Sequence, residues 1–218
     1  MYVNSRFVIV KFKIKNDEAI IMKFFPLVTM SSIVLLGMVS TAQAGDFNYN
    51  YVEGGYSNYN VKEVSSAFSA GGSYGVTENV NIIGSYSKAN FDTNSSVDTS
   101  LNQYSVGAGY HMPIAPQTDI LADVSYLNME AEASTNGIAF SASKGGYGLG
   151  VGVRHQLTDS VEANARVAYM SIDNTSDTAV SVGGRYNINK AMSAGLDLTT
   201  VTDKGPEIIT SSLRWNFL

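Results

Sequence analysis

The feature that most constrains this chain is an alternation of apolar and polar residues with a period of two, which recurs from residue 46 to the end. Successive side chains of a β-strand point to opposite faces, so this period indicates strands rather than helices. No apolar run after residue 44 approaches the length of a transmembrane helix. Ten segments are predicted as strands: 46–57, 64–76, 80–91, 101–112, 118–131, 141–157, 161–173, 179–188, 191–202 and 207–218.

The links between these segments alternate in length. Short turns are predicted at 77–79, 113–117, 158–160 and 189–190, and longer polar links at 58–63, 92–100, 132–140, 174–178 and 203–206. Short periplasmic turns that alternate with longer outer loops are typical of bacterial outer-membrane barrels. An even number of strands then places both ends of the barrel on the periplasmic side. All five longer links are short for a surface that would display a large adhesin.

Each segment has one apolar face and one face that carries most of its charge. The eighth places Val180, Val182 and Tyr186 on the face opposite Arg185, and the last places Trp215 opposite its neighbour Arg214. A soluble sandwich would alternate in the same way, with its apolar face inside. The predicted alternative is the inverted arrangement, with apolar side chains toward lipid and ionic side chains enclosed.

The positions of the aromatic residues favour the inverted arrangement, because they cluster near the ends of the segments. Two interfacial belts at the two membrane surfaces account for such a distribution. The predicted periplasmic belt comprises Tyr74, Tyr110, Tyr186, Trp215 and Phe217, and the outer belt comprises Phe68, Tyr104, Tyr147, Tyr169 and Phe91. A soluble core gives no reason for this placement.

The N-terminal region has the pattern of a secretory signal. Lys23 precedes an apolar run over 27–39, and Ala42-Gln43-Ala44 follows as a small-x-small cleavage site. We expect cleavage after Ala44, which divides the chain into an extension and signal peptide (1–44) and a barrel (45–218). Residues 1–21 have two interpretations: a long basic leader, or sequence upstream of a true start at Met22, which we favour.

The charge of the remaining chain excludes one class of partner. Of the 14 Lys and Arg residues five precede residue 45, and of the 19 Asp and Glu residues two do, so the barrel region has a net charge of −8. Nucleic-acid binding requires the opposite sign. The chain has no Cys, which excludes a disulfide scaffold and a thiolate metal site. No cofactor is expected.

The last nine residues, 210–218, run Thr-Ser-Ser-Leu-Arg-Trp-Asn-Phe-Leu. Leu213, Trp215 and Phe217 resemble the terminal-strand signal that the barrel assembly machinery reads, with Leu218 as an additional residue. Together with the signal peptide and the Gly- and Tyr-rich hairpins, residues 45–218 resemble the small outer-membrane β-barrel proteins, akin to the OmpA transmembrane domain and the opacity-type porin family. That resemblance implies a closed antiparallel up-and-down transmembrane barrel. The family usually has eight strands, the alternative to the ten counted here.

The polar faces place eight charges in the predicted lumen. These are Glu53, Asp123, Glu162 and Asp197, with Arg154, Arg166, Arg185 and Arg214. A charge in a narrow lumen is costly unless it is paired. Two interpretations remain: a salt-bridged plug, which we favour, and an ion-selective pore. The glycines of 146–152 either leave a cavity or make room for long side chains opposite.

The sequence predicts no catalysis. The two histidines, His111 and His155, fall near periplasmic turns, and no nucleophile signature surrounds either. Both are interpreted as interfacial polar residues. The expected role is structural or surface interaction, and the alternative is a narrow channel for ions or small solutes. Expected partners are outer-membrane lipids, lipopolysaccharide, the assembly machinery and a host surface molecule, with the chain as a monomer.

Overall fold

The computed structural model describes residues 8–13, 19–24, 47–61, 64–91, 98–135, 138–202 and 205–217. The apolar run of the predicted signal peptide and its cleavage site lie outside these ranges. Strands β1 (Val8–Lys13) and β2 (Ala19–Phe24) form a separate antiparallel pair. Within the described part of the chain, no helix combines the length and apolar character needed to cross a membrane.

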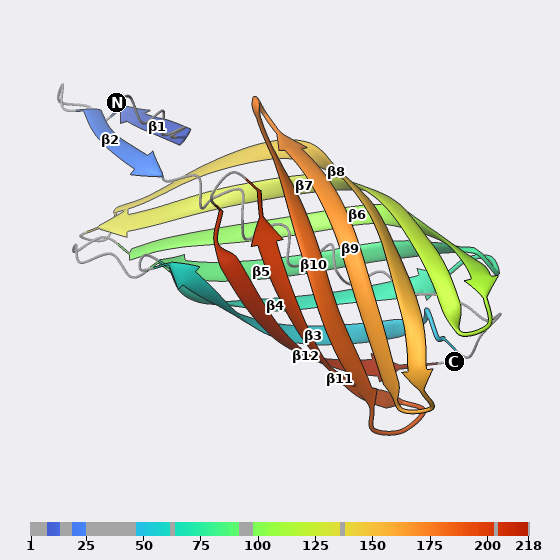
Figure 1. The fold of residues 1–218 in the computed structure, drawn as a ribbon. Helices are drawn as coiled ribbons and strands as arrows, with labels where there is room; N and C mark the ends of the chain where they lie inside the picture. The colour runs from blue at the N-terminus through green and yellow to red at the C-terminus, as the bar shows by residue number, and fades with distance from the viewer. Residues whose placement is uncertain are drawn as a thin grey trace, which may run out of the picture.

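The ten remaining strands form one closed antiparallel barrel (Figure 1). They are β3 (Tyr51–Val61), β4 (Val64–Gly75), β5 (Val80–Phe91), β6 (Asp98–Ala115), β7 (Thr118–Thr135), β8 (Ile138–Thr158), β9 (Val161–Ile172), β10 (Thr175–Asn187), β11 (Met192–Val201) and β12 (Glu207–Asn216). The predicted fold class and the count of ten are therefore confirmed. Each strand pairs with its neighbours in sequence, as expected of hairpins joined by short turns.

The barrel closes between its first and last strands. Arg214 of β12 pairs in register with Glu53 of β3, and Trp215 pairs with Val52. The N–H of Phe217 also donates to the carbonyl of Asn50, with the two atoms 2.9 Å apart. Both ends of the barrel segment therefore lie at the same end of the cylinder, as predicted. Closure leaves no unpaired edge along this seam, which is the condition for a sheet in lipid.

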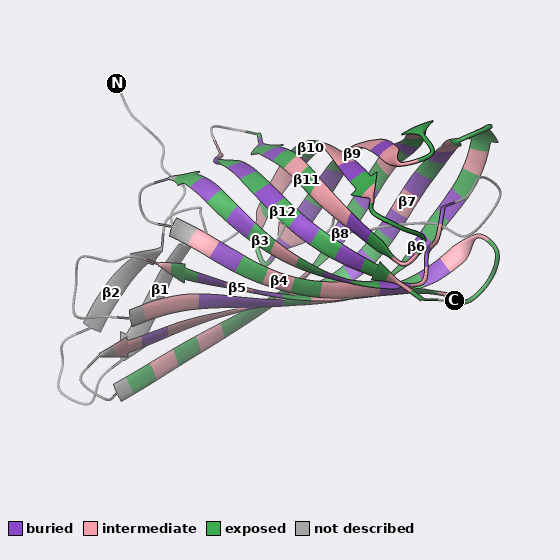
Figure 2. Ribbon diagram, turned by 90° about the horizontal axis from the view of Figure 1, so that it is seen from below, coloured by how far each residue is buried: buried purple, intermediate pink, exposed green. Residues whose placement is uncertain are grey.

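The predicted faces are confirmed along the barrel. Figure 2 shows exposed and buried bands alternating along the strands, and β12 alternates strictly from Glu207 to Trp215. The large apolar residues of this strand's outer face are exposed: Leu213 is 60% exposed and Trp215 56%, whereas Arg214 between them is 5% exposed. This is the inverse of a soluble domain, because the apolar side chains face outward and the charges face inward.

The aromatic residues form two outward-facing belts. Tyr74, Tyr110, Tyr186 and Trp215 are exposed at the end that was predicted to be periplasmic. At the other end lie the predicted Phe68, Tyr104, Tyr147 and Tyr169, joined by Tyr56, Tyr86 and Tyr126. One assignment is wrong: Phe91 packs against the buried apolar cluster inside the barrel. It lies an even number of residues from the inward-facing Ala89, so strand geometry places both on the inner face.

The strand ends differ from the predicted ones in several regions. Residues 47–50 are not a strand, and β3 begins at Tyr51. At the outer end β6, β7 and β8 reach 18, 18 and 21 residues, so most of the predicted link 132–140 is strand. The predicted link 174–178 is a tight turn at Asp173 and Asn174, followed directly by β10. Polar composition suggested loops there, but polar residues also suit strands that extend into water.

Candidate functional site: the barrel lumen

The lumen has a layer of buried ionic side chains near its periplasmic end. The structure places all eight predicted charges on the inner face, and it brings seven of them into ion pairs. Each of those seven residues is at most 8% exposed. Isolated charges in such surroundings would be costly, so their pairing is what allows them to remain buried.

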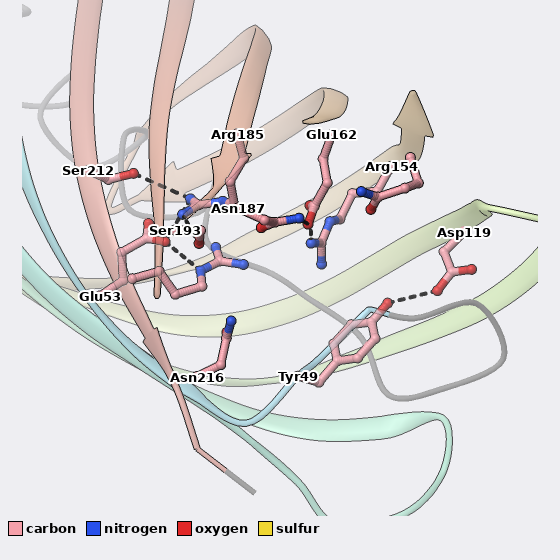
Figure 3. Close-up of polar contacts among 12 residues, drawn as sticks. Tyr49, Glu53, Asp119, Arg154, Glu162, Arg185, Asn187, Ser193, Ser212 and Asn216 are labelled. Carbon is pink, nitrogen blue, oxygen red and sulfur yellow. Dashed lines mark hydrogen bonds and ion pairs between the residues drawn. The ribbon is translucent and has the colours of Figure 1, made fainter. Parts of the chain in front are cut away.

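Glu53 is the centre of the largest group, because two arginines converge on one of its carboxylate oxygens. The distance from Oε2 is 2.7 Å to Arg185 Nη2 and 2.6 Å to Arg214 Nε. The Arg185 guanidinium also donates to the hydroxyls of Ser193 and Ser212, at 3.2 and 3.3 Å (Figure 3). The group joins β3, β10, β11 and β12, so it holds together the strands at which the barrel closes.

Two further pairs lie on β7, β8 and β9. Arg154 donates to Glu162, which also accepts a hydrogen bond of 3.0 Å from Asn187. Arg166 donates to Asp123 on the opposite side of β8. Asp197 is the exception, because no cation among the described residues lies within ion-pair distance of it.

Glycines on the inner face leave the space that these long side chains occupy. A Cβ added at Gly150 would collide with the guanidinium of Arg166 and would lie 2.6 Å from Asp123 Oδ1. A Cβ at Gly195 would lie 2.9 Å from the Arg185 guanidinium. Of the two interpretations of the glycine row, room for arginine is therefore confirmed at Gly150.

An aromatic group fills the periplasmic end of the lumen. Residues 47–50 run inside the barrel, and Phe47 and Tyr49 are almost completely buried. The Tyr49 ring stacks on His111 with centroids 3.8 Å apart, and its hydroxyl donates to Asp119 at 3.1 Å (Figure 3). The guanidinium of Arg154 lies 4.5 Å from the centre of the Phe47 ring, a cation–π contact.

This group was not predicted, and the interpretation of His111 as an interfacial residue is wrong, because its ring is fully buried in the lumen. The sequence did contain a signal. Phe47, Tyr49 and Tyr51 lie an even number of residues before Glu53, so the alternation places all three on the inner face. What the alternation does not indicate is that the strand ends while the chain continues inside the barrel.

The outer end of the lumen is apolar. Eleven buried residues form one cluster, with Phe91 and Ala131 packed against it: Tyr59, Ala67, Ala89, Leu101, Leu127, Met129, Met170, Ile172, Ala179, Val201 and Ile208. Hydroxyl pairs such as Ser57 with Thr210, at 2.9 Å, separate it from the ionic layer. The sequence analysis did not predict this apolar layer, because it used the alternation only to locate charged residues on the inner face.

His155 lies on the outer surface, as predicted. It is exposed, and its Nδ1 is 2.8 Å from the hydroxyl of Thr118 on β7. In the described part of the chain no carboxylate contacts the His155 ring to orient it as a catalytic base. The same residues contain no cluster of three or more His, Cys, Asp or Glu able to hold a metal ion.

A closed antiparallel barrel with an apolar exterior, two aromatic belts and charges inside defines a transmembrane β-barrel protein. The family model described as "Outer membrane protein beta-barrel domain" matches residues 31–187, which is more than half of the chain. The chain belongs to this family and resides in the outer membrane.

Comparison with curated protein sequences finds no match. Several solved barrels are similar in structure. The KdgM porin has 11% identity and a TM-score of 0.48, covering 77% of this chain and 99% of its own. The NalP translocator domain of Neisseria meningitidis has 9% identity and a TM-score of 0.49, with coverage of 87% and 95%. Ail of Yersinia pestis has 17% identity and a TM-score of 0.41, with coverage of 77% and 99%.

Proposed function

We propose that this protein is a closed, non-conducting outer-membrane barrel with a structural or surface-interaction role. The ionic layer is the observation that carries the proposal. Seven lumen charges are at most 8% exposed and each forms an ion pair. A pore lined by the same residues would leave them in contact with water, and a narrow barrel filled by side chains has no such column.

The apolar outer layer supports the same conclusion. Leu127 and Ile208 are completely buried, and Met170 nearly so, in the part of the lumen that a solute from outside would reach first. Hydrophobic constrictions block ions by excluding water. The aromatic group at Phe47 and Tyr49 closes the opposite end. Each of the three layers opposes conduction by a different physical means.

Conductance across a planar lipid bilayer tests this proposal. The folded, reconstituted protein is expected to give no discrete current steps. The alternative function, a narrow channel for ions or small solutes, requires steps whose size or ion selectivity changes when Arg185→Gln or Arg214→Gln removes a lumen charge. Such steps would overturn the closed barrel. Folding of each sample is checked beforehand by its shift in electrophoretic mobility on heating.

We assign no enzymatic activity, and we propose that the protein acts as a monomer in contact with outer-membrane lipids and lipopolysaccharide. Leu213 and Trp215 on the last strand, and Phe217 directly after it, are exposed, which suits recognition by the barrel assembly machinery during insertion. A host surface molecule is the proposed external partner. Purified protein should release no product from lipid or peptide substrates, and turnover that is lost in a His155→Ala variant would contradict this assignment.

A further inference from the structure

The outer part of β8 extends beyond the end of its neighbour β9 and is therefore unpaired on that side. On its β7 side the pairing continues outward to Thr135 and Ile138. On its β9 side the pairing ends at Gly146 and Ile172. Residues 141–145 therefore pair with β7 only, and no other strand that the structure describes pairs with them. Figure 1 shows the yellow β7–β8 hairpin reaching beyond the orange strands at this end.

This edge lies outside the hydrocarbon of the membrane. The edge begins two residues beyond Tyr147 in the outward direction. Tyr147 belongs to the outer aromatic belt and pairs in register with Tyr126 of β7. Beyond the belt the outward face of β7 carries Glu130 and Glu132, which hydrocarbon would not tolerate. An unpaired edge is excluded from lipid but is stable in water, where it offers a template for another strand.

The local structure holds the edge open. β9 and β10 are joined by a tight turn in which Asp173 adopts the left-handed conformation, with φ of 54°. The turn ends β9 at Ile172, so β9 does not continue alongside β8. Lys144 Nζ lies 2.7 Å from Asp173 Oδ2. This ion pair neutralises Lys144, whose charge would otherwise oppose the addition of a strand. It also fixes the turn beside the start of the edge.

We propose that residues 141–145 of β8 bind an extended polypeptide as an added strand, with basic side chains on its outward face and apolar side chains on its inward face. Addition of a strand to an exposed edge uses main-chain hydrogen bonds for affinity and alternate side chains for specificity. The side chains beside the edge indicate which alternate residues fit.

The outward face selects for basic residues. Ser141 and Ser143 pair in register with Glu132 and Glu130 of β7. An added strand would lie about 5 Å beyond the serines. Because serine is short, a Lys or Arg side chain can extend over it to the carboxylate on the next strand. Ser141 and Ser143 are exposed, so this path is open in the structure.

The inward face selects for apolar residues. Ala142 of β8 pairs in register with Ala131 of β7, and Ala133 follows two residues later. These small side chains continue the apolar lining of the outer lumen, because Ala131 packs against the buried cluster. A Val or Ile side chain on the added strand would extend this apolar surface opposite Ala142. Lys144, on the same face of β8, is 58% exposed and already paired with Asp173.

This inference deepens the surface-interaction role proposed above, and the two fail separately, since conductance does not depend on the edge of β8. The test uses the full barrel in nanodiscs of zwitterionic lipid. The probe is a fluorescent, end-blocked octapeptide of alternating Lys and Val, and its binding is followed by fluorescence anisotropy against empty nanodiscs. Two control peptides have the same composition: one with the lysines and valines in separate blocks, and one N-methylated at its amides.

One double variant and one single control variant complete the design. Ser141→Lys with Ser143→Lys fills the path over the edge and neutralises Glu130 and Glu132. Asn90→Lys adds a lysine at an exposed outer position of β5, a strand that is paired on both sides. Heat-dependent electrophoretic mobility checks that both variants fold.

We expect the alternating peptide to bind the wild-type barrel and the Asn90→Lys variant equally. Binding should weaken at least tenfold with the double variant and with either control peptide. Equal binding of the N-methylated peptide would overturn the proposal, because it would show attraction by charge alone. No binding above empty nanodiscs would also overturn it. The proposal would also be overturned if the barrel dimerised, the double variant abolished the dimer, and no peptide bound. The occupant of the edge would then be a second copy of this chain.

Discussion

At the scale of single residues, Glu53 is the most important member of the ionic layer, because both Arg185 and Arg214 pair with it. Removing one member of a buried pair leaves an uncompensated charge, which costs much more than the pair contributes as a whole. A surface pair contributes little, since water already solvates both partners. The same chemistry therefore has very different consequences inside and outside the barrel.

Glu53→Gln is expected to lower the free energy of unfolding by about 3–5 kcal/mol, because two buried guanidinium groups lose their carboxylate. Lys144→Gln, which breaks the exposed pair with Asp173, should cost less than about 1 kcal/mol. Urea unfolding from lipid vesicles measures both, with fluorescence of the single tryptophan, Trp215, as the signal. Equal losses for the two variants would contradict the buried character of the ionic layer.

The glycines can be tested with one change at two positions. Gly150→Ala should destabilise the barrel by about 1–3 kcal/mol, because the new methyl group overlaps the space of Arg166 and Asp123. Gly54→Ala should have little effect or stabilise slightly, since its Cβ would meet nothing closer than the Ser69 carbonyl oxygen, 4.0 Å away. The same urea titration compares them, and a neutral Gly150→Ala would argue against tight packing in the lumen.

At the scale of elements, the segment before β3 is the part that departs most from its predicted form. Residues 47–50 were predicted as the start of a strand, yet they lie within the barrel and contact the final residues of the chain. Asn48 Nδ2 lies 3.3 Å from the carbonyl oxygen of Phe217, and the N–H of Gly75 donates to the side chain of Asn50 at 2.9 Å. Local alternation was the same for strand and non-strand conformations, so only these distant partners decide between them.

Tyr49→Ala is expected to lower the free energy of unfolding by about 3 kcal/mol, since it removes a fully buried ring that stacks on His111. Tyr49→Phe keeps the ring and loses only the hydrogen bond to Asp119, so it should cost about 1 kcal/mol. The order of the two unfolding midpoints in urea is the measurement. If both variants matched the wild type, the segment would not be packed in the lumen in solution.

At the scale of the whole molecule, the outward-facing side chains define a membrane-spanning band between the two aromatic belts. Along β8 the outward residues change from polar above Tyr147 to apolar below it, as shown by Ser143 on one side and Val151 on the other. The position of a substitution along this single strand should therefore determine its cost. Depth in the bilayer, rather than exposure, is the relevant quantity.

Val151→Arg should destabilise the folded barrel in lipid vesicles by about 2–4 kcal/mol, because the charge would lie within hydrocarbon. Ser143→Arg, on the same face of the same strand but above the belt, should be near neutral. Both residues are exposed, so a soluble protein would tolerate both changes equally. Folded, detergent-free solubility of the barrel in water would likewise contradict the inverted arrangement.

The alternation in sequence was sufficient to predict the number of strands, their faces and the eight inward charges, because each of these follows from the period of two. The partners of those charges did not follow from it. Arg166 with Asp123 and Arg214 with Glu53 are 43 and 161 residues apart in the chain, and alternation carries no information about such distances.

Sequence by itself therefore determined the class of fold and which side chains face inward, since both are properties of a single strand and its immediate neighbours. The tertiary structure alone decided how the lumen is layered, where residues 47–50 lie and which edge of β8 remains uncovered. The physical reason is that the stagger between strands sets which residues from distant parts of the chain share one height, and the stagger becomes fixed only when β12 pairs with β3.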